Sequence, residues 1–511
     1  MDAAWRRRYN QMVFRKGQLI ELDVSDAGDG ASCFGKLPEG LAVFVSGPVA
    51  VGDRVEASVT KIKQNYLEAR LARVLAPSPA RVTPPCAHFG VCGGCKWQHA
   101  RYDEQLRLKR KIVADALAHI GGFRDHPVAD PLPSAREYGY RNKLEFSFGD
   151  RRYLLESEMV ATGGRDLPEP KVASPACSDG TFAPATRGRG GRPKDYALGF
   201  HVPGRFDKIV DVDHCHIAAP EMNEALTLVK AFGRARGLSI YNTRTHEGFL
   251  RNLVVRKAFA TGEFMIYLIT SSHDAALMSA LDAELATHFG ARLTTFVNGV
   301  TSKKNTVARG EQDIVVRGPG CITERLGSLS FSISPTSFFQ TNTAQAEVLY
   351  NEVLRLADPG ADDVVHDLYC GTGTIALWLA GRCRAVVGCE LEASSLRDAE
   401  ANARANGIGN ARFLALDLKH YANAARELPP ELQPRIVVVD PPRAGLHPDL
   451  VLELRALRPE RIVYVSCNPA SLARDAQGLC ADGAFTLGPV QPVDLFPHTG
   501  HIESVARLDR A

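Results

Sequence analysis

The sequence has no long hydrophobic run and no excess of charge of one sign. Hydrophobic residues make up 45% of its 511 residues and charged residues 23%, values that exclude collagen, a coiled coil and disorder throughout. No apolar stretch approaches the 18 residues that a membrane span needs, so no membrane partner is expected. The basic segment 1–17 is not followed by an apolar region, so we expect no secretory signal.

Local charge is more informative than the net charge of +3. Residues 1–16 and 187–194 are rich in Arg and Lys, with Asp2 as the only acid in either segment. Such segments suit a polyanion, although a solvated tail and a solvated loop explain them equally well. Twelve cysteines without a secretory signal indicate a reducing, cytoplasmic location, where close cysteine spacings serve metal binding or catalysis.

Length and pattern together predict three domains, at roughly 150 residues per domain. Residues 17–77 contain short alternating strands separated by glycines, which is typical of a small β-barrel. Residues 86–335 mix strand-like and helical runs and are expected to form an α+β central domain. This domain includes a basic helix at 102–120 and, at 156–197, a long loop rich in Gly, Pro and Arg.

Residues 336–511 predict an α/β domain with a doubly wound sheet. An amphipathic helix is expected at 343–357, and strand-like and helical runs alternate after it. This alternation indicates a mostly parallel sheet with helices on both faces. The expected strands are residues 364–368, 385–389, 411–416, 436–439 and 462–465.

The side chains at the ends of these strands are polar or reactive: Asp367, Glu390, Asp417, Asp440 and Cys467. In open α/β sheets, ligands bind beyond the carboxyl ends of the strands. We therefore expect these five side chains to converge on one site.

The loop after the first of these strands has features of a nucleoside site. Gly371 and Gly373 permit a tight turn close to a ligand, and Glu390 follows Gly371 by 19 residues, as a ribose-binding acid does in dinucleotide folds. The third glycine of the G-x-G-x-x-G pattern is missing, which disfavours a pyrophosphate. A nucleoside without phosphates, such as S-adenosylmethionine, fits better.

Two groups of cysteines have distinctive contexts. Cys467 lies in a Ser-Cys-Asn-Pro turn beyond an apolar strand, where a reactive thiol would be partly exposed. Cys86, Cys92 and Cys95 lie within ten glycine-rich residues, a spacing that favours a thiophilic metal. The spacing does not distinguish zinc from iron–sulfur. The cysteines expected to be buried in the core are Cys370, Cys383, Cys389 and Cys480.

The C-terminal motifs resemble those of the RNA uracil-C5 methyltransferase family, which uses S-adenosylmethionine. They cover most of residues 330–511 in the family's order, and the N-terminal barrel resembles a TRAM domain, an RNA-binding module. The matching segments are SPTSFFQTN (334–342), DLYCGTGT (367–374), CELE (389–392), VVVDPPRAGL (437–446), VYVSCNP (463–469) and LFPHTGHIES (495–504).

The resemblance implies a Rossmann-like class I methyltransferase sheet and assigns catalytic roles. Cys467 corresponds to the nucleophile that adds to carbon 6 of uracil, and Glu503 to the base that removes the proton from carbon 5. Asp440 corresponds to a residue that holds the uracil and the methyl end of the cofactor. The cofactor-binding positions implied are Gln340, Tyr369, Thr374, Glu390, Asp417 and Asp440, of which Thr374 replaces an asparagine found in some members.

The resemblance also implies a [4Fe-4S] cluster and an RNA substrate. The cluster would be bound by Cys86, Cys92, Cys95 and a distant cysteine, for which Cys215 is the best match and Cys177 the alternative. The expected substrate is 23S rRNA rather than the T-loop of tRNA, with no DNA partner and a monomeric protein. The expected RNA contacts are the barrel and Arg107, Lys109, Arg110, Lys111, Arg141 and Lys143, with Phe338 and Phe339 beside the base.

Three other classes of protein fit the sequence less well. Adenine amino-methyltransferases usually have an aromatic residue where this chain has Arg443. Cytosine-C5 methyltransferases place a Pro-Cys or Thr-Cys pair where this chain has Asp440-Pro441-Pro442. A cluster-stabilised RNA-binding protein without turnover should lack part of the catalytic set, and no part of it is missing.

Overall fold

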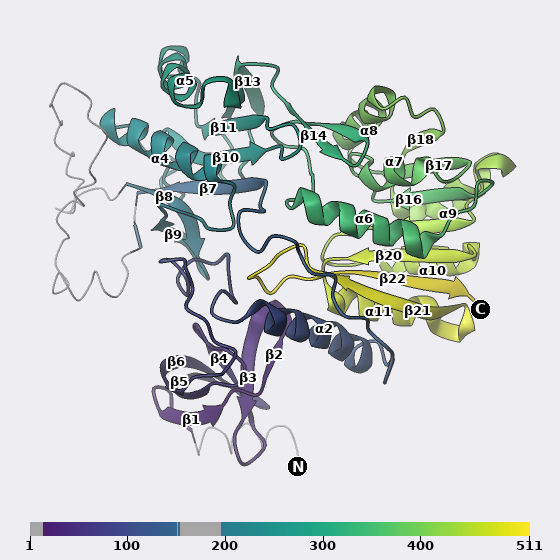
Figure 1. Cartoon of the computed structure of the whole chain (residues 1–511), viewed down its shortest axis with the longest axis horizontal. Coiled ribbons are helices and arrows are strands. Elements are labelled where there is room, and N and C mark those ends of the chain that lie inside the picture. The colour runs from purple at the N-terminus through teal and green to yellow at the C-terminus, as the bar shows by residue number, and fades with distance from the viewer. Residues whose placement is uncertain (1–13, 151, 154–195) are drawn as a thin grey trace.

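The computed structural model describes residues 14–150, 152–153 and 196–511 (Figure 1). Its N-terminal part is a six-stranded sheet in the order β1-β5-β6-β4-β3-β2, curled around an apolar core to which Trp97, Leu108 and Ile112 also contribute. Val55, Ala57 and Val59 of β5 are buried in that core, so the predicted barrel is confirmed. The strands are β1 (Leu19–Asp23), β2 (Asp26–Gly28), β3 (Ser32–Lys36), β4 (Ala42–Ser46), β5 (Arg54–Ile62) and β6 (Tyr66–Ala76).

The chain then passes through the cysteine-rich segment into helix α2 (Tyr102–His119), which has nearly the predicted bounds. Although α2 follows the barrel in sequence, it packs along α11 (Pro469–Cys480) and β21 (Phe485–Val493) of the C-terminal sheet (Figure 1). Val113 and Leu117 of α2 are buried in the core on that side of the sheet. The helix therefore joins two cores, because its Leu108 and Ile112 are buried in the core of the barrel.

The central part is a seven-stranded sheet in the order β13-β12-β11-β10-β7-β8-β9, in which only β11 and β12 are parallel. Helices α4 (Pro220–Ala235) and α5 (Ala275–Phe289) share one apolar core with it. The strands are β7 (Lys143–Gly149), β8 (Ala197–Val202), β9 (Arg205–Asp211), β10 (Leu250–Lys257), β11 (Phe264–Thr270), β12 (Leu293–Val300) and β13 (Gln312–Arg317).

The C-terminal sheet has the order β18-β17-β16-β19-β20-β22-β21, with five parallel strands and an antiparallel pair at one edge. Ile436 and Val438 of β19 face one apolar core and Val437 and Val439 face the other, which is why this short strand is apolar throughout. The strands are β16 (Val364–Leu368), β17 (Ala385–Glu390), β18 (Ala411–Ala415), β19 (Ile436–Val439), β20 (Arg461–Ser466), β21 and β22 (Glu503–Arg510). The predicted doubly wound sheet is confirmed.

Helices cover both faces of this sheet (Figure 1). One core contains α6 (Thr343–Ala357), α7 (Thr374–Ala380) and α8 (Ala393–Ala405), and the other contains α9 (Tyr421–Glu427), α10 (Pro448–Leu457), α11 and α2. A hairpin of β14 (Ile322–Leu326) and β15 (Leu329–Ile333) packs against α6 and α8. No helix in the described ranges is long and apolar enough to cross a bilayer.

Candidate active site

The parallel strands β16 to β20 end along one edge of the C-terminal sheet. β16 lies between β17 and β19, so the connections after β16 and β19 leave on opposite sides. This reversal of strand order creates the crevice where ligands bind in such sheets. The loop after Leu368 starts at this crevice, and Asp440 lies beside it: the Asp440 N–H donates to the Leu368 carbonyl at 3.3 Å.

The loop that follows β16 has an unusual backbone. Tyr369, Gly371 and Gly373 have φ angles of 64°, 54° and 80°, in the left-handed region. A Cβ at Gly373 would lie 3.0 Å from the Cβ of Ala399, so the loop also packs too closely for a larger residue. Thr374 begins α7, and its hydroxyl accepts a hydrogen bond from Tyr350 at 3.2 Å.

The Glu390 carboxylate supports this loop. Its Oε2 accepts from the Gly371 N–H at 3.2 Å, and its Oε1 accepts from the Leu391 N–H at 2.7 Å. Asp417 is exposed near the end of the next strand, where its Oδ1 accepts from the Lys419 N–H at 3.1 Å. Glu390 therefore contacts the glycine loop directly, and the charges of both Glu390 and Asp417 act on Tyr369 at the start of that loop.

Asp367 is the buried member of the five strand-end residues. It lies inside β16, is fully buried, and its Oδ2 accepts from the Ala376 N–H at 2.9 Å. Burial, followed by the charge of Asp440, raises its pKa well above the ordinary value. Asp367 therefore lies near Asp440 but beneath the loop, where it supports the start of α7.

Strand register brings Cys467 and Glu503 together. β20 and β22 are antiparallel, with Ser466 opposite Ser504. Cys467 directly follows Ser466, and Glu503 directly precedes Ser504. Two residues 36 positions apart in sequence are therefore neighbours across the sheet. Cys467 is half-buried, as predicted, whereas Glu503 is 5% exposed.

The acids around the thiol change its ionisation. Burial, followed by the charges of Glu503 and Asp440, raises the pKa of Cys467 to about 11, while Arg443 opposes this shift. Loss of solvation raises the pKa of Asp440 to about 7. Burial, followed by Asp440, raises the pKa of Glu503 well above its usual range. The side chains of Cys467, Asp440 and Glu503 therefore lie close enough together for the charge of one to change the pKa of another.

Arg443 and His501 complete the group, and neither was assigned a role from the sequence. Arg443 is exposed, and its Nη2 lies 3.0 Å from Nδ1 of His501. The Asn468 side chain donates to the Arg443 carbonyl at 2.9 Å, which ties the Asp-Pro-Pro-Arg turn to the Cys467 turn. The two motifs themselves were visible in the sequence, but their contact depends on strand order.

The segment before α6 contributes Gln340, which is 8% exposed and whose carbonyl accepts from the Asn142 side chain at 2.8 Å. Its neighbours differ from each other. Phe339 is buried and packs against Phe331 with ring centroids 5.9 Å apart, so it is a core residue. Phe338 is 68% exposed and remains available to a ligand.

The four described candidate metal ligands gather between the barrel and the central sheet. Cys86, Cys92 and Cys215 each contribute to the raised pKa of Cys95, which burial brings to about 12. The thiols are thus close enough to interact electrostatically. No group of three or more His, Cys, Asp or Glu side chains is arranged to hold a metal ion among the described residues. Cys177 lies outside those residues, as does nearly all of segment 156–197.

The expected RNA contacts on α2 are changed by the structure. Lys109 is fully buried against Asp494, so the prediction that it contacts RNA was wrong. Arg107, Arg110 and Lys111 keep some exposure but pair with Glu104, Asp130 and Asp26 respectively. Helical periodicity would have placed Lys109 on the side of Ile112 and Val113, and that signal was available in the sequence.

Comparison with known proteins supplies the context of this site. Residues 305–511 match the family model described as tRNA (Uracil-5-)-methyltransferase, and residues 13–72 match the TRAM domain. An uncharacterized RNA methyltransferase of Chlorobaculum tepidum is 46% identical over 501 residues, 98% of each chain. Another, of Porphyromonas gingivalis, is 37% identical over 463 residues, 90% of this chain and 94% of the relative.

A solved structure is similar over nearly the whole chain. It is the tRNA (uracil-54, C5)-methyltransferase of Pyrococcus abyssi in complex with S-adenosyl-L-homocysteine. The TM-score is 0.69 at 28% sequence identity, and the match covers 96% of this chain and 99% of that one. The similarity therefore includes the barrel, the central sheet and the C-terminal sheet.

Proposed function

The chain belongs to the RNA uracil-C5 methyltransferase family, and we propose that it methylates carbon 5 of a uridine in 23S rRNA, with S-adenosylmethionine as the methyl donor. The observation that carries this proposal is the closeness of Cys467, directly after β20, to Glu503, the first residue of β22. A nucleophile and a base on opposite strands at the ligand-binding edge are what this reaction needs.

The proposed reaction begins with addition of the Cys467 thiolate to carbon 6 of the uracil. The Sγ–C6 bond forms, and the electrons of the C5=C6 bond move into an enolate whose carbon 5 attacks the methyl group of the sulfonium. S-adenosylhomocysteine leaves as a neutral thioether. Glu503 then accepts the proton from carbon 5, the C5=C6 bond re-forms, and the Sγ–C6 bond breaks to restore the thiolate.

The cofactor is proposed to lie along the loop after β16. Glu390 would bind the ribose, with Asp417 near the adenine. Support comes from the left-handed backbone at Gly371 and Gly373 and from the contact between Glu390 and that backbone. The remaining proposed contacts are Gln340, Tyr369, Thr374 and Asp440. The Pyrococcus abyssi relative, which was solved with S-adenosylhomocysteine, supports the same type of ligand.

We further propose that Cys86, Cys92, Cys95 and Cys215 hold a [4Fe-4S] cluster. The donor set supports this, because the charges of Cys86 and Cys92 raise the pKa values of both Cys95 and Cys215, and binding of the thiolates to iron would relieve this repulsion. Its role would be to fold this segment, and no reaction step passes through it. Protein purified without oxygen should contain about four irons and four sulfides per chain; a zinc content of one per chain would contradict the cluster.

The choice of RNA is tested directly by mapping 5-methyluridine. Ribosomal and transfer RNA from cells with and without the gene would be digested and analysed by mass spectrometry. The proposal expects one 5-methyluridine to disappear from 23S rRNA and to return with the wild-type gene. Loss from the tRNA T-loop, the substrate type of the Pyrococcus abyssi relative, would replace the rRNA proposal with tRNA and keep the chemistry.

The chemistry is tested by two substitutions. Cys467→Ala should abolish methyl transfer while S-adenosylhomocysteine binding changes less than about threefold, because the thiol takes no part in holding the cofactor. Glu503→Gln should accumulate a covalent protein–RNA complex that survives heating in detergent. Methyl transfer by the Cys467→Ala protein would refute the nucleophile, and the absence of any complex with Glu503→Gln would refute the base.

A further inference from the structure

The residues between β21 and β22 connect the proposed base to the rest of the molecule. β21 ends at Val493, β22 begins at Glu503, and these two residues are paired. Residues 494–502, here called the base loop, therefore begin and end at one position of the sheet. Glu503 is thus the first residue after the base loop.

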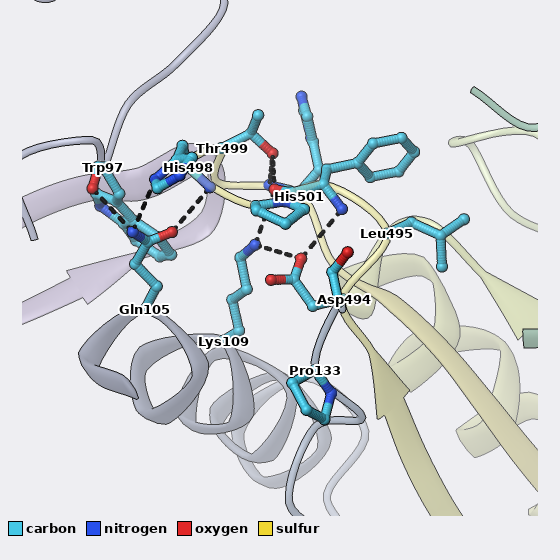
Figure 2. A network of polar contacts seen from close by, with 12 residues as sticks. Trp97, Gln105, Lys109, Pro133, Asp494, Leu495, His498, Thr499 and His501 are labelled. Carbon is cyan, nitrogen blue, oxygen red and sulfur yellow. Dashed lines mark hydrogen bonds and ion pairs between the residues drawn. The ribbon is translucent and has the colours of Figure 1, made fainter. Parts of the chain in front are cut away.

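The base loop is held by a buried ion pair from α2. The Lys109 Nζ donates to Asp494 Oδ1 at 2.6 Å and to the Phe496 carbonyl at 3.0 Å, and both charged side chains have no exposed surface. The Tyr102 hydroxyl donates to the other oxygen of Asp494 at 3.0 Å. Figure 2 shows Lys109 reaching from α2 to the start of the base loop.

A second contact holds the middle of the base loop. The Gln105 side chain accepts from the His498 N–H at 2.8 Å and lies 3.1 Å from its Nδ1, and it also donates to the Trp97 carbonyl (Figure 2). His498 has a φ of 67°, which a non-glycine residue adopts only when its surroundings hold it. Its carbonyl in turn accepts from the N–H groups of Lys96 and Trp97, directly after Cys95.

Two further parts of the chain reach the same loop. A Cβ at Gly500 would lie 2.7 Å from the backbone nitrogen of Ala31, so the barrel packs directly against it. Tyr140, before the central sheet, donates from its hydroxyl to the Pro497 carbonyl at 3.0 Å. The base loop is thus the place where the barrel, the cysteine-rich segment, α2 and the C-terminal sheet meet.

This arrangement is more than stability requires. A buried ion pair contributes little net stability, since desolvation of the two charges offsets their attraction. What it provides is a defined geometry, because Lys109 bonds both Asp494 and the Phe496 carbonyl and so ties the start of the base loop to α2. The same holds for Gln105, whose amide fits one arrangement of His498 and Trp97.

We propose that Gln105 and Lys109 are positioning residues that set the place of Glu503 by holding the base loop. The inference rests on the proposed function of Glu503. It predicts a specific defect when these contacts are removed: methyl transfer still occurs, but the resolution of the Cys467 adduct becomes slow, because the carboxylate no longer meets the carbon 5 proton.

The test uses the full-length protein with S-adenosylmethionine and total RNA from cells that lack the gene. The main variant is Gln105→Leu, which removes the hold on His498 without leaving a buried charge. The second is Lys109→Met with Asp494→Asn, which removes both charges of the pair together and so avoids an unpaired buried ion. The control is Asp115→Asn, on the same helix, whose ion-pair partner Lys111 keeps its second partner Asp26.

Three quantities separate positioning from general damage. For both variants we expect S-adenosylhomocysteine affinity within about twofold of wild type and first-turnover methyl transfer within about threefold. The steady-state kcat should fall about tenfold or more while the covalent fraction rises, and the control should match wild type. Wild-type kcat, or parallel loss of first turnover and kcat without more adduct, would overturn the inference. Absence of methylation by the wild-type protein would instead refute the proposed function.

Discussion

The proposed nucleophile lies in surroundings that oppose its ionisation. Two carboxyl groups, Glu503 and Asp440, raise the pKa of the Cys467 thiol, and Arg443 is the cation that lowers it. A thiol with a pKa of about 11 is almost fully protonated near neutral pH, so we expect it to react slowly with oxidants and alkylating agents in the free protein. Reactivity then depends on the balance of three nearby charges.

This balance leads to a prediction for the free protein. Asp440→Asn removes a negative neighbour and should lower the pKa of Cys467, whereas Arg443→Ala removes a positive neighbour and should raise it. Modification by iodoacetamide, followed as a function of pH by peptide mass spectrometry, should show the midpoint moving down for the first variant and up for the second. Equal midpoints in all three proteins would contradict the charge group.

The sequence predicted residues well where a motif and a strand end coincide. Glu390 and Cys467 lie at the expected edge because periodicity located their strands. Lys109 was wrongly assigned to the RNA surface because it lies among the basic residues of segment 107–111, which do not all lie on the same side of the helix. The contact between Cys467 and Glu503 was beyond pattern analysis, since it depends on the antiparallel insertion of β22 beside β20.

Among the elements, the hairpin β14–β15 joins the central and C-terminal sheets through one buried carboxylate. Glu324 has no exposed surface and accepts hydrogen bonds from the Phe259 N–H at 2.7 Å, the Ala260 N–H at 2.9 Å and the Thr343 hydroxyl at 2.8 Å. One side chain thereby links the turn after β10 to the start of α6. The segment that carries Gln340 lies between this hairpin and α6.

We therefore expect Glu324→Ala to lower the free energy of unfolding by about 3 kcal/mol, since it removes the buried charged acceptor of three hydrogen bonds. Glu324→Gln keeps one carbonyl oxygen and should cost roughly half as much. Urea unfolding followed by circular dichroism measures both values. Equal stabilities of the alanine and glutamine proteins would show that the hydrogen bonds to Glu324 do not hold this junction.

In the molecule as a whole, order in sequence and order in space differ. The predicted central domain was drawn as the continuous segment 86–335, yet α2 packs on α11 and the β14–β15 hairpin packs on α6 and α8. Hydrophobic periodicity identified α2 and its length. It could not identify the core in which the apolar face of α2 is buried, because the sequence pattern of an amphipathic helix does not depend on the element it packs against.

The membership of α2 in the C-terminal core gives a prediction about cooperativity. Leu117 is 1% exposed in that core, so Leu117→Ala should lower stability by about 3 kcal/mol through the cavity it leaves. Ile120, directly after the same helix, is 45% exposed, so Ile120→Ala should change stability by less than about 0.5 kcal/mol.

S-adenosylhomocysteine identifies which thermal transition belongs to the C-terminal sheet. It would bind that sheet, so it should raise the midpoint of the transition in which the sheet unfolds, here called the marked transition. The Leu117→Ala protein should lose stability in that marked transition. If Leu117→Ala leaves the marked transition unchanged and lowers the midpoint of another one, α2 unfolds independently of the cofactor-binding sheet. The base loop would then be held by a helix that unfolds separately from the C-terminal sheet.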